Sequence, residues 1–489
     1  MFDDLNLQKQ TILIKLLPLL FLGFTLVSFS QNTAIPDTNF EQALIDLGYD
    51  SGAPDGSVPT ANISGVTILD VINKNISSLT GIEDFTALTY LRCSENQLTS
   101  LDVNNNIALN YLYCYNNALT SLDVSNNTAL IKLYCENNQL TSSLDLSNNI
   151  SLTELVCQSN QLTSLDMSNN TALTYLDCKN NQLTSLNVSN NISLTVLACA
   201  NNQLTSLDVS NNIALGYLSC SINQLTSLDV TQNTALTVLA CKNNQLTSLN
   251  VTQNTALNGL ICDSNQLTSL DVRTNTALTT LYCVDNQLTS IDVSTNPALT
   301  YLNCDDNQLT SLDVSSNPAL TYLDCDDNQL TSLDMRTNTA LTYFSCVDNQ
   351  LTSLDVRNGN KTNFTNFYST NNPDLSCIFV DDVVYSTTNW TNIDPASTFV
   401  NNEAACEVLS LEYNAFELNV TIHPNPTDNY LFVEGNKNPI SISIYNLLGK
   451  EVLSIKNTNN INVQALPSGV YVIRISDGIG QTNRKFIKN

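Results

Sequence analysis

The chain has 489 residues and a formal net charge of −27, because 45 acidic residues outnumber 18 lysines and arginines. This excess of negative charge argues against a nucleic acid partner, since phosphate binding needs clustered Lys and Arg. The only histidine is His423, so the rest of the chain has no Ser–His–Asp, Cys–His or HExxH arrangement, and we expect no enzyme.

Residues 1–30 have the pattern of a secretory signal peptide. Lys9 and Lys15 precede an apolar run from Leu16 to Phe29, and cleavage is expected after Ser30. A membrane anchor is the alternative, but the apolar run is shorter than the roughly 20 residues that a spanning helix needs. We therefore expect no transmembrane anchor in the mature chain.

Residues 31–65 are predicted to form an N-terminal cap. Asp37 can cap a helix whose apolar stripe contains Phe40, Leu44 and Leu47. Such a helix can cover the leucines at the open end of a repeat array.

Residues 66–371 repeat one unit, which is legible as ALTYLDCDDNQLTSLDMRTNT from Ala319 to Thr339. The interval is 21 residues, except between Cys135 and Cys157, where an additional serine makes it 22. Self-similarity at a short fixed period predicts a solenoid, in which each coil buries its apolar residues against its neighbours. Thirteen cysteines mark the interval, at Cys93, Cys114, Cys135, Cys157, Cys178, Cys199, Cys220, Cys241, Cys262, Cys283, Cys304, Cys325 and Cys346.

Each unit predicts one short strand. Leu320, Leu323 and Cys325 alternate with polar or aromatic residues, which is the period-two pattern of a strand with one buried face. Thiols at that position, such as those of Cys304 and Cys325, behave as small hydrophobes. No CxxC pair accompanies them, so we expect core packing rather than zinc binding.

An asparagine stands three residues after each of these cysteines, as Asn96, Asn117, Asn307 and Asn328 illustrate. Where a coil turns away from its strand, backbone N–H and C=O groups are buried, and a side-chain amide can satisfy both kinds. We therefore interpret these asparagines as a structural ladder. A second row, eight residues before each cysteine, is expected to close the turn into the next strand.

The segment LxxLxCxxNxL, found from Leu320 to Leu330, resembles leucine-rich repeats, and the whole unit resembles 21-residue repeats of the IRREKO kind. The first unit, from Val66 to Ala87, has Val71 at the cysteine position and resembles repeats of internalin-like bacterial surface proteins. The resemblance implies a solenoid whose parallel sheet lines its inner face.

Residues 372–411 leave the repeat pattern and are predicted to form a C-terminal cap. They contain Trp390, the only tryptophan, which we expect to cover the last coil rather than to stack on a ligand.

Two cysteines in this cap lie outside the repeat. Aligning the Asn-Pro pair at Asn372 with the pair at Asn317 places Val380, and not Cys377, at the position that holds the cysteine in the repeats. Cys377 is therefore out of register. We expect Cys377 to pair with Cys406 in a disulfide that staples the end of the array.

Residues 412–489 contain β-branched runs broken by Pro-Asn-Pro, Leu-Leu-Gly and Pro-Ser-Gly, which predict a small all-β sandwich. These runs and turns resemble the C-terminal sorting domain of the type IX, or Por, secretion system. The resemblance implies contact with the type IX machinery and a protein that is secreted or attached to the outer cell surface. The matching residues include Pro424, Asn425, Pro426, Gly449, Gly469, Tyr471 and Lys488.

Tyrosines recur three residues before the cysteine, on the side of the strand that faces away from the core. Exposed tyrosines offer a broad apolar area with a polar tip, as recognition surfaces do. The alternative is cross-strand stacking that stabilises the sheet, and both can hold. The candidate ligand-binding residues are Tyr90, Tyr111, Tyr175, Tyr217, Tyr301, Tyr322 and Tyr343.

A group of acidic residues late in the array includes Asp305, Asp306, Asp326 and Asp327. Adjacent coils place such carboxylates about one strand spacing apart, where they repel. Calcium would relieve the repulsion, and a solvated anionic edge is the alternative. We expect no other cofactor.

These patterns together predict a β-rich leucine-rich-repeat solenoid with a parallel sheet on its inner face, followed by a small all-β sandwich. We expect the protein to mediate protein–protein recognition or adhesion. The alternatives are a surface glycan-binding protein that supports nutrient uptake and a cryptic carboxylate-dependent hydrolase.

Overall fold

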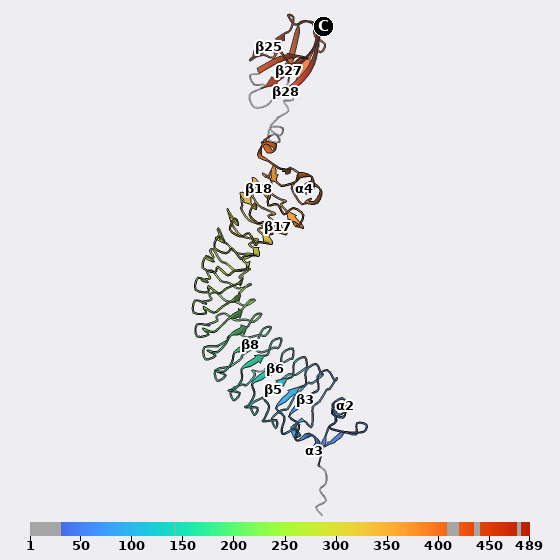
Figure 1. Cartoon of the computed structure of the whole chain (residues 1–489), viewed down its shortest axis with the longest axis vertical. Helices are drawn as coiled ribbons and strands as arrows, with labels where there is room; N and C mark the ends of the chain where they lie inside the picture. The colour runs from blue at the N-terminus through green and yellow to red at the C-terminus, as the bar shows by residue number, and fades with distance from the viewer. Residues whose placement is uncertain (1–30, 142, 408–419, 435–440, 477–480) are drawn as a thin grey trace, which may run out of the picture. The chain divides into compact units, whose positions relative to one another are not determined.

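The computed structural model describes residues 31–141, 143–407, 420–434, 441–476 and 481–489. The predicted signal peptide, residues 1–30, lies outside this part of the chain. The chain divides into two compact units, residues 1–330 with 337–346, and residues 331–336 with 347–489. Figure 1 shows the coils of the first unit stacked in chain order.

The first unit begins with a short hairpin and a helix. Strand β1 (Asn32–Ala34) pairs antiparallel with β2 (Ser57–Pro59), and helix α2 (Thr38–Asp46) precedes the short helix α3 (Thr60–Ile63). Asp37 caps α2, as predicted: its Oδ1 accepts from the backbone N–H of Asn39 at 2.9 Å.

The same carboxylate ties the helix to the first coil. Oδ2 of Asp37 accepts from the backbone N–H of Ser77 at 2.7 Å and from its hydroxyl at 2.6 Å. Phe40 of α2 stacks on Phe85, with ring centroids 6.4 Å apart, beside the 3₁₀ turn η1 (Ile82–Asp84). The helix therefore covers the apolar end of the array.

Each following coil contributes one three-residue strand to a parallel sheet. Neighbouring strands pair in register, so that Leu302 lies beside Leu323 and Tyr301 beside Tyr322. The sheet runs in chain order through β3 (Ile68–Asp70), β4 (Tyr90–Arg92), β5 (Tyr111–Tyr113), β6 (Lys132–Tyr134), β7 (Glu154–Val156), β8 (Tyr175–Asp177), β9 (Val196–Ala198), β10 (Tyr217–Ser219), β11 (Val238–Ala240), β12 (Gly259–Ile261), β13 (Thr280–Tyr282), β14 (Tyr301–Asn303), β15 (Tyr322–Asp324) and β17 (Tyr343–Ser345).

The core follows the predicted pattern. The middle residue of each strand is fully buried, and so is the cysteine after it, or Val71 after β3. The leucines and valines of the opposite side of the coil, such as Leu309 and Val314, are buried too. That opposite side is extended and turned rather than helical in these coils. Threonine, serine and valine dominate it, and they favour extended backbone over helix.

The second unit begins with a parallel sheet built from the opposite side of the last coils. Its strands are β16 (Ser332–Asp334), β18 (Ser353–Asp355), β20 (Cys377–Phe379) and β21 (Thr398–Val400), in that order. Strand β19 (Asn366–Tyr368) and helix α4 (Val383–Asn389) belong to the same region. Trp390 is buried and packs between aromatic rings, stacking on Phe367 at 4.8 Å, so it serves the core as predicted.

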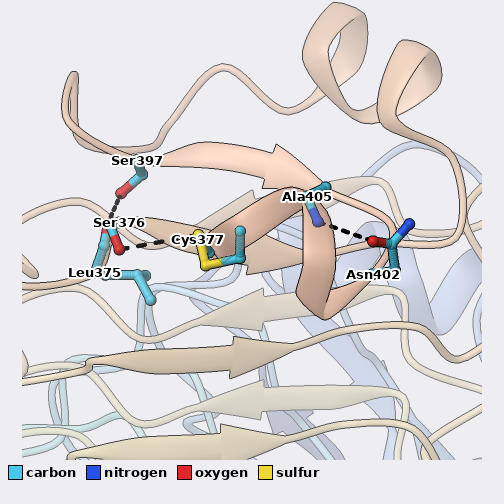
Figure 2. Close-up of a disulfide and its surroundings, with 7 residues drawn as sticks. Leu375, Ser376, Cys377, Ser397, Asn402 and Ala405 are labelled. Carbon is cyan, nitrogen blue, oxygen red and sulfur yellow. Dashed lines mark hydrogen bonds between the residues drawn. A yellow bond between two sulfur atoms is a disulfide. The ribbon is translucent and has the colours of Figure 1, made fainter. Parts of the chain in front are cut away.

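The expected disulfide between Cys377 and Cys406 is present, and it ties β20 to the chain that follows β21 (Figure 2). Two hydrogen bonds flank it: the Ser397 hydroxyl donates to the carbonyl of Leu375 at 2.5 Å, and the N–H of Ala405 donates to Oδ1 of Asn402 at 2.9 Å.

The prediction that Val380 continues the cysteine row was wrong. The N–H of Val356 donates to the carbonyl of Phe379 at 2.9 Å, so Val380 follows Val356 in the valine row of the opposite side. The error arose because Asn372 belongs to the ladder that follows the strands: its Oδ1 accepts from the N–H of Leu351 at 3.0 Å.

The C-terminal part is a two-sheet sandwich, as predicted. One antiparallel sheet contains β22 (Thr421–His423), β23 (Tyr430–Glu434) and β26 (Asn460–Asn462), and the other contains β25 (Glu451–Lys456), β24 (Ser441–Asn446), β27 (Gly469–Ser476) and β28 (Gln481–Lys488). Leu431 and Val433 of the first sheet share one core with Ile444, Ile473 and Phe486 of the second. In the part of the chain that the structure describes, no helix is long and apolar enough to cross a membrane.

Candidate recognition surface

The seven predicted tyrosines all occupy the first position of a strand, on the side that faces away from the core. We call this side of the sheet the display face; it consists of the first and third residues of each strand. The tyrosines are half-buried, and Tyr217 is 37% exposed. In-register pairing places them in one column, as the sequence predicts.

The column is not continuous, because the tyrosines form two clusters. In the later cluster, Tyr282, Tyr301, Tyr322 and Tyr343 stack in succession, with ring centroids 4.6, 4.0 and 4.2 Å apart. Aromatic stacking at these distances stabilises the sheet. The four tyrosines remain partly exposed.

The earlier cluster combines the first and third strand positions. Tyr90 lies 6.0 Å from Tyr111 and 5.4 Å from Tyr113, and Tyr113 lies 5.0 Å from Tyr134. Tyr175 and Tyr217 belong to neither cluster. Each lies beside Val196 in the neighbouring strand, so the structure separates them from the other five tyrosines.

Two charged residues in the tyrosine column were missed by the sequence reasoning. Nζ of Lys132 lies 2.7 Å from Oε1 of Glu154, and the Tyr134 hydroxyl donates to Oε2 of Glu154 at 2.7 Å. The signal was available, since these residues stand where other coils have tyrosine. They give the earlier cluster a polar margin.

Buried and half-buried carboxylates border the later cluster. Burial, followed by the charge of Asp324, raises the pKa of Asp305 to about 6. Asp324 is 9% exposed and accepts from the Tyr322 hydroxyl at 3.2 Å, while burial raises its pKa too. Asp326 accepts from the Ser345 hydroxyl at 2.5 Å. Asp324 belongs to the display face, and Asp305 and Asp326 follow strands β14 and β15, so the later end of this face has an acidic margin.

The shift at Asp305 predicts a pH effect on stability. The ordinary pKa of an aspartate is about 4, so ionising Asp305 costs more in the folded state than in the unfolded state. The stability that this group contributes below about pH 4 is therefore lost as the pH rises through 6. We expect D305N to stabilise the protein by about 1 kcal/mol above pH 7, after allowance for solvent screening, and to have little effect below pH 4.

Thermal unfolding between pH 4 and pH 8 measures this difference. D306N is the matched control, because it removes the same charge from an exposed residue of the same coil. Asp306 has a φ of 52°, a backbone conformation that asparagine also adopts. Equal pH profiles for the two variants would contradict the assignment.

The calcium hypothesis gains no support from the geometry. Asp306 and Asp327 have φ of 52° and 46°, in the left-handed region that Asn and Asp tolerate better than most residues. The same position holds Asn116 and Asn243 in other coils. Among the described residues, no group of three or more His, Cys, Asp or Glu side chains is arranged to hold a metal ion. Backbone conformation therefore accounts for the aspartates at 306 and 327.

The asparagine ladder has the predicted geometry. The amide nitrogen of Asn328 donates to the carbonyls of Cys304 at 3.0 Å and Cys325 at 3.3 Å, while its oxygen accepts from the N–H of Leu309 at 2.9 Å. Asn307 makes the equivalent bonds one coil earlier. Each amide thus joins consecutive coils.

Asn96 and Asn117 occupy the same place in the first coils. Nδ2 of Asn96 donates to the carbonyl of Cys93 at 3.0 Å, and Nδ2 of Asn117 to that of Cys114 at 3.1 Å. Burial raises the pKa of the Cys304 and Cys325 thiols well above its usual range, so both stay protonated.

The opposite side of the coil contains grooves that the sequence reasoning did not anticipate. One of these grooves measures about 500 Å³ and lies where the 22-residue interval interrupts the repeat. Hydrogen bonds from Ser147 lower the pKa of Asp145, and hydrogen bonds from Ser168 lower the pKa of Asp166, so both carboxyl groups stay ionised in the groove. The extra serine was the available signal. The polar lining of this groove consists of Ser143, Asp145, Ser147, Ser164, Asp166, Ser168, Asn169, Ser185 and Asn187.

In the sandwich, the predicted sorting-motif residues serve turns and strand edges. Asn425, between Pro424 and Pro426, donates from Nδ2 to the carbonyl of Lys485 at 3.0 Å and accepts from the N–H of Ile487 at 2.9 Å. It therefore pairs with the backbone of the edge strand β28.

The other motif residues hold the remaining turns. The Tyr471 hydroxyl donates to the carbonyl of Pro467 at 2.8 Å, Gly449 has a φ of 75°, and Gly469 begins β27. Lys488 is buried at the end of β28. These motif residues thus lie at turns and strand ends of the sandwich.

Family comparisons match both parts of the chain. Residues 421–489 match the secretion system C-terminal sorting domain, and residues 276–317 and 297–338 match leucine-rich repeats. Internalin J of Listeria monocytogenes is 38% identical over 77 residues, which are 16% of this chain and 8% of that protein.

Solved structures show the same fold. The functional domain of InlJ from Listeria monocytogenes, described as including a cysteine ladder, has a TM-score of 0.62 and 29% identity over 94% of this chain and 99% of that one. A leucine-rich-repeat protein of Leptospira interrogans has a TM-score of 0.56 and 22% identity over 70% of this chain and 97% of that one, which shows the fold alone.

The sorting domain directs its protein to the outer cell surface or to secretion. The repeats, the cysteine row and the C-terminal sandwich all agree with these matches. The chain is therefore a bacterial leucine-rich-repeat protein that carries a type IX secretion C-terminal sorting domain.

Proposed function

We propose that this protein recognises or adheres to another protein outside the cell through its display face. The main support is the later tyrosine cluster, in which the Tyr322 ring stacks between Tyr301 and Tyr343, with centroid distances of 4.0 and 4.2 Å. Tyrosine is enriched among residues that dominate interface energies, because it brings a large apolar area at a small entropic cost.

The carboxylates beside this cluster indicate the kind of partner. Asp324 accepts from the Tyr322 hydroxyl, Asp305 and Asp326 follow the strands β14 and β15 that hold Tyr301 and Tyr322, and the chain as a whole carries a charge of −27. A partner surface with apolar groups surrounded by lysine or arginine would complement this end of the display face. Residues 31–65 and 372–411, in this proposal, cap the array and take no part in binding.

A double substitution tests the proposal. We expect Y301S/Y322S to weaken binding of a partner captured with the full-length chain by about tenfold to hundredfold, because two interface tyrosines are truncated. T310A/S311A is the matched control, because Thr310 and Ser311 are exposed and lie on the side of the same coil opposite the display face. Equal affinities for the two variants would contradict a role for the display face.

A glycan ligand is the second candidate, and the groove at Ser143 favours it. Hydroxyl, carboxylate and amide groups line this groove, and they match the hydrogen-bonding groups of a polyhydroxylated ligand. Binding to a glycan array without any protein partner, lost in D145N/D166N and retained in Y301S/Y322S, would favour this function over the first.

A further inference from the structure

The hairpin between β24 and β25 presents two adjacent leucines to solvent. Leu447 is 72% exposed and Leu448 is 92% exposed, the highest value among the large apolar side chains of the described residues. Exposed apolar groups that adjoin one another commonly mark an interaction site.

The fold of the turn does not depend on these leucine side chains. Oδ1 of Asn446 accepts from the N–H groups of Leu448 and Lys450, each at 3.0 Å, and the N–H of Gly449 donates to the carbonyl of Asn446 at 2.9 Å. Gly449 has the positive φ, 75°, that the turn requires. Asn446 and Gly449 therefore form the turn, and polar side chains at 447 and 448 would be compatible with it.

The base of the hairpin is closed and polar. The N–H of Asn446 donates to the carbonyl of Lys450 at 3.0 Å, and the guanidinium of Arg474 lies over the Tyr445 ring, 5.1 Å from its centroid. The leucines thus form an apolar tip above a polar base. A tip of this kind suits an apolar pocket with a polar rim.

Other apolar side chains exposed in the sandwich are part of strands. Tyr430 and Phe432 alternate with buried residues along β23, and Phe432 is covered on one side by His423, whose ring lies 5.7 Å away. Leu447 and Leu448, by contrast, lie in a turn and are not part of the core that the two sheets share.

We propose that the Leu447–Leu448 tip inserts into an apolar pocket of the type IX secretion machinery and is required for the domain to be recognised. This proposal rests on the export role of the sorting domain, which names the partner. The tip contributes apolar contact, while Asn446 and Gly449 hold it in position before binding, which lowers the entropic cost of association.

An export assay with the full-length chain in the native host tests this proposal. We expect L447S/L448S to lower the amount of protein at the cell surface and in the medium by about tenfold or more. The variant protein should then accumulate on the inner side of the outer membrane, in the periplasm. L447M/L448M keeps the apolar contact and should be exported normally. V384S is the matched control, because Val384 is 77% exposed and lies outside the sandwich.

Two further measurements make the outcome decisive. The melting temperature of each purified variant shows whether the sandwich has folded, and the single substitution L448S provides a milder change if the double variant unfolds. Normal export of folded L447S/L448S, or of L448S at the level of V384S, would overturn the proposal. A chain without residues 421–489 that is exported normally would instead overturn the export role of the domain itself.

Discussion

Replacing Asn202 with alanine is expected to lower the free energy of unfolding by about 3 to 5 kcal/mol, because several buried backbone groups lose their partner at once. Nδ2 of Asn202 donates to the carbonyls of Cys178 and Cys199, at 3.1 and 3.0 Å, and its Oδ1 accepts from the N–H of Leu183 at 3.0 Å. Leu183 belongs to the preceding coil, so the substitution weakens the contact between neighbours from which a solenoid gains its stability.

Urea denaturation followed by circular dichroism measures this loss. Q203A is the matched control, since Gln203 is the next residue and is exposed, and its replacement should change the free energy by less than about 0.5 kcal/mol. If N202A and Q203A were equally stable, the asparagine row would not be holding the coils together.

Removing the disulfide is the second large perturbation. We expect C377S/C406S to lower the stability of the C-terminal cap by about 2 to 4 kcal/mol, because the bond closes a loop with a sequence separation of 29. Cys377 lies in β20, which pairs with β18 and β21, so the loss should be confined to this sheet and to the aromatic cluster beside it.

Trp390 reports on this region directly, because it is the only tryptophan and is buried against Phe364, Phe367 and Phe399. Its fluorescence should change at a lower urea concentration in C377S/C406S than in the unmodified protein. Reductant should shift the unmodified protein in the same direction and leave the variant unchanged. A fluorescence transition insensitive to both treatments would show that the bond does not stabilise the cap.

Most of the fold could be predicted because each structural role recurs in every coil. Leucines and cysteines at fixed spacing identified the core, and Asn328 and its equivalents could be assigned to the turn from their amide chemistry alone. The capping role of Asp37 was also predictable, because the residue types at a helix start have a direct physical cause.

The one error arose where two parts of the unit resemble each other, and other features were not foreseen because backbone conformation or neighbours in space determine them. Val380 was assigned to the wrong row because the cysteine and valine runs share one pattern. Asp306 and Asp327 suggested calcium because the sequence does not reveal a positive φ. The division of the tyrosines into two clusters depends on neighbours in three dimensions, such as Val196 beside Tyr175.

Site-specific photo-crosslinking tests the central claim most directly. A photoreactive amino acid placed at Tyr322, on the display face, is compared with the same group at Thr310, which is exposed on the opposite side of the coil. The account predicts that a protein partner is captured from position 322 and not from position 310. Capture from position 310 with none from position 322 would contradict it.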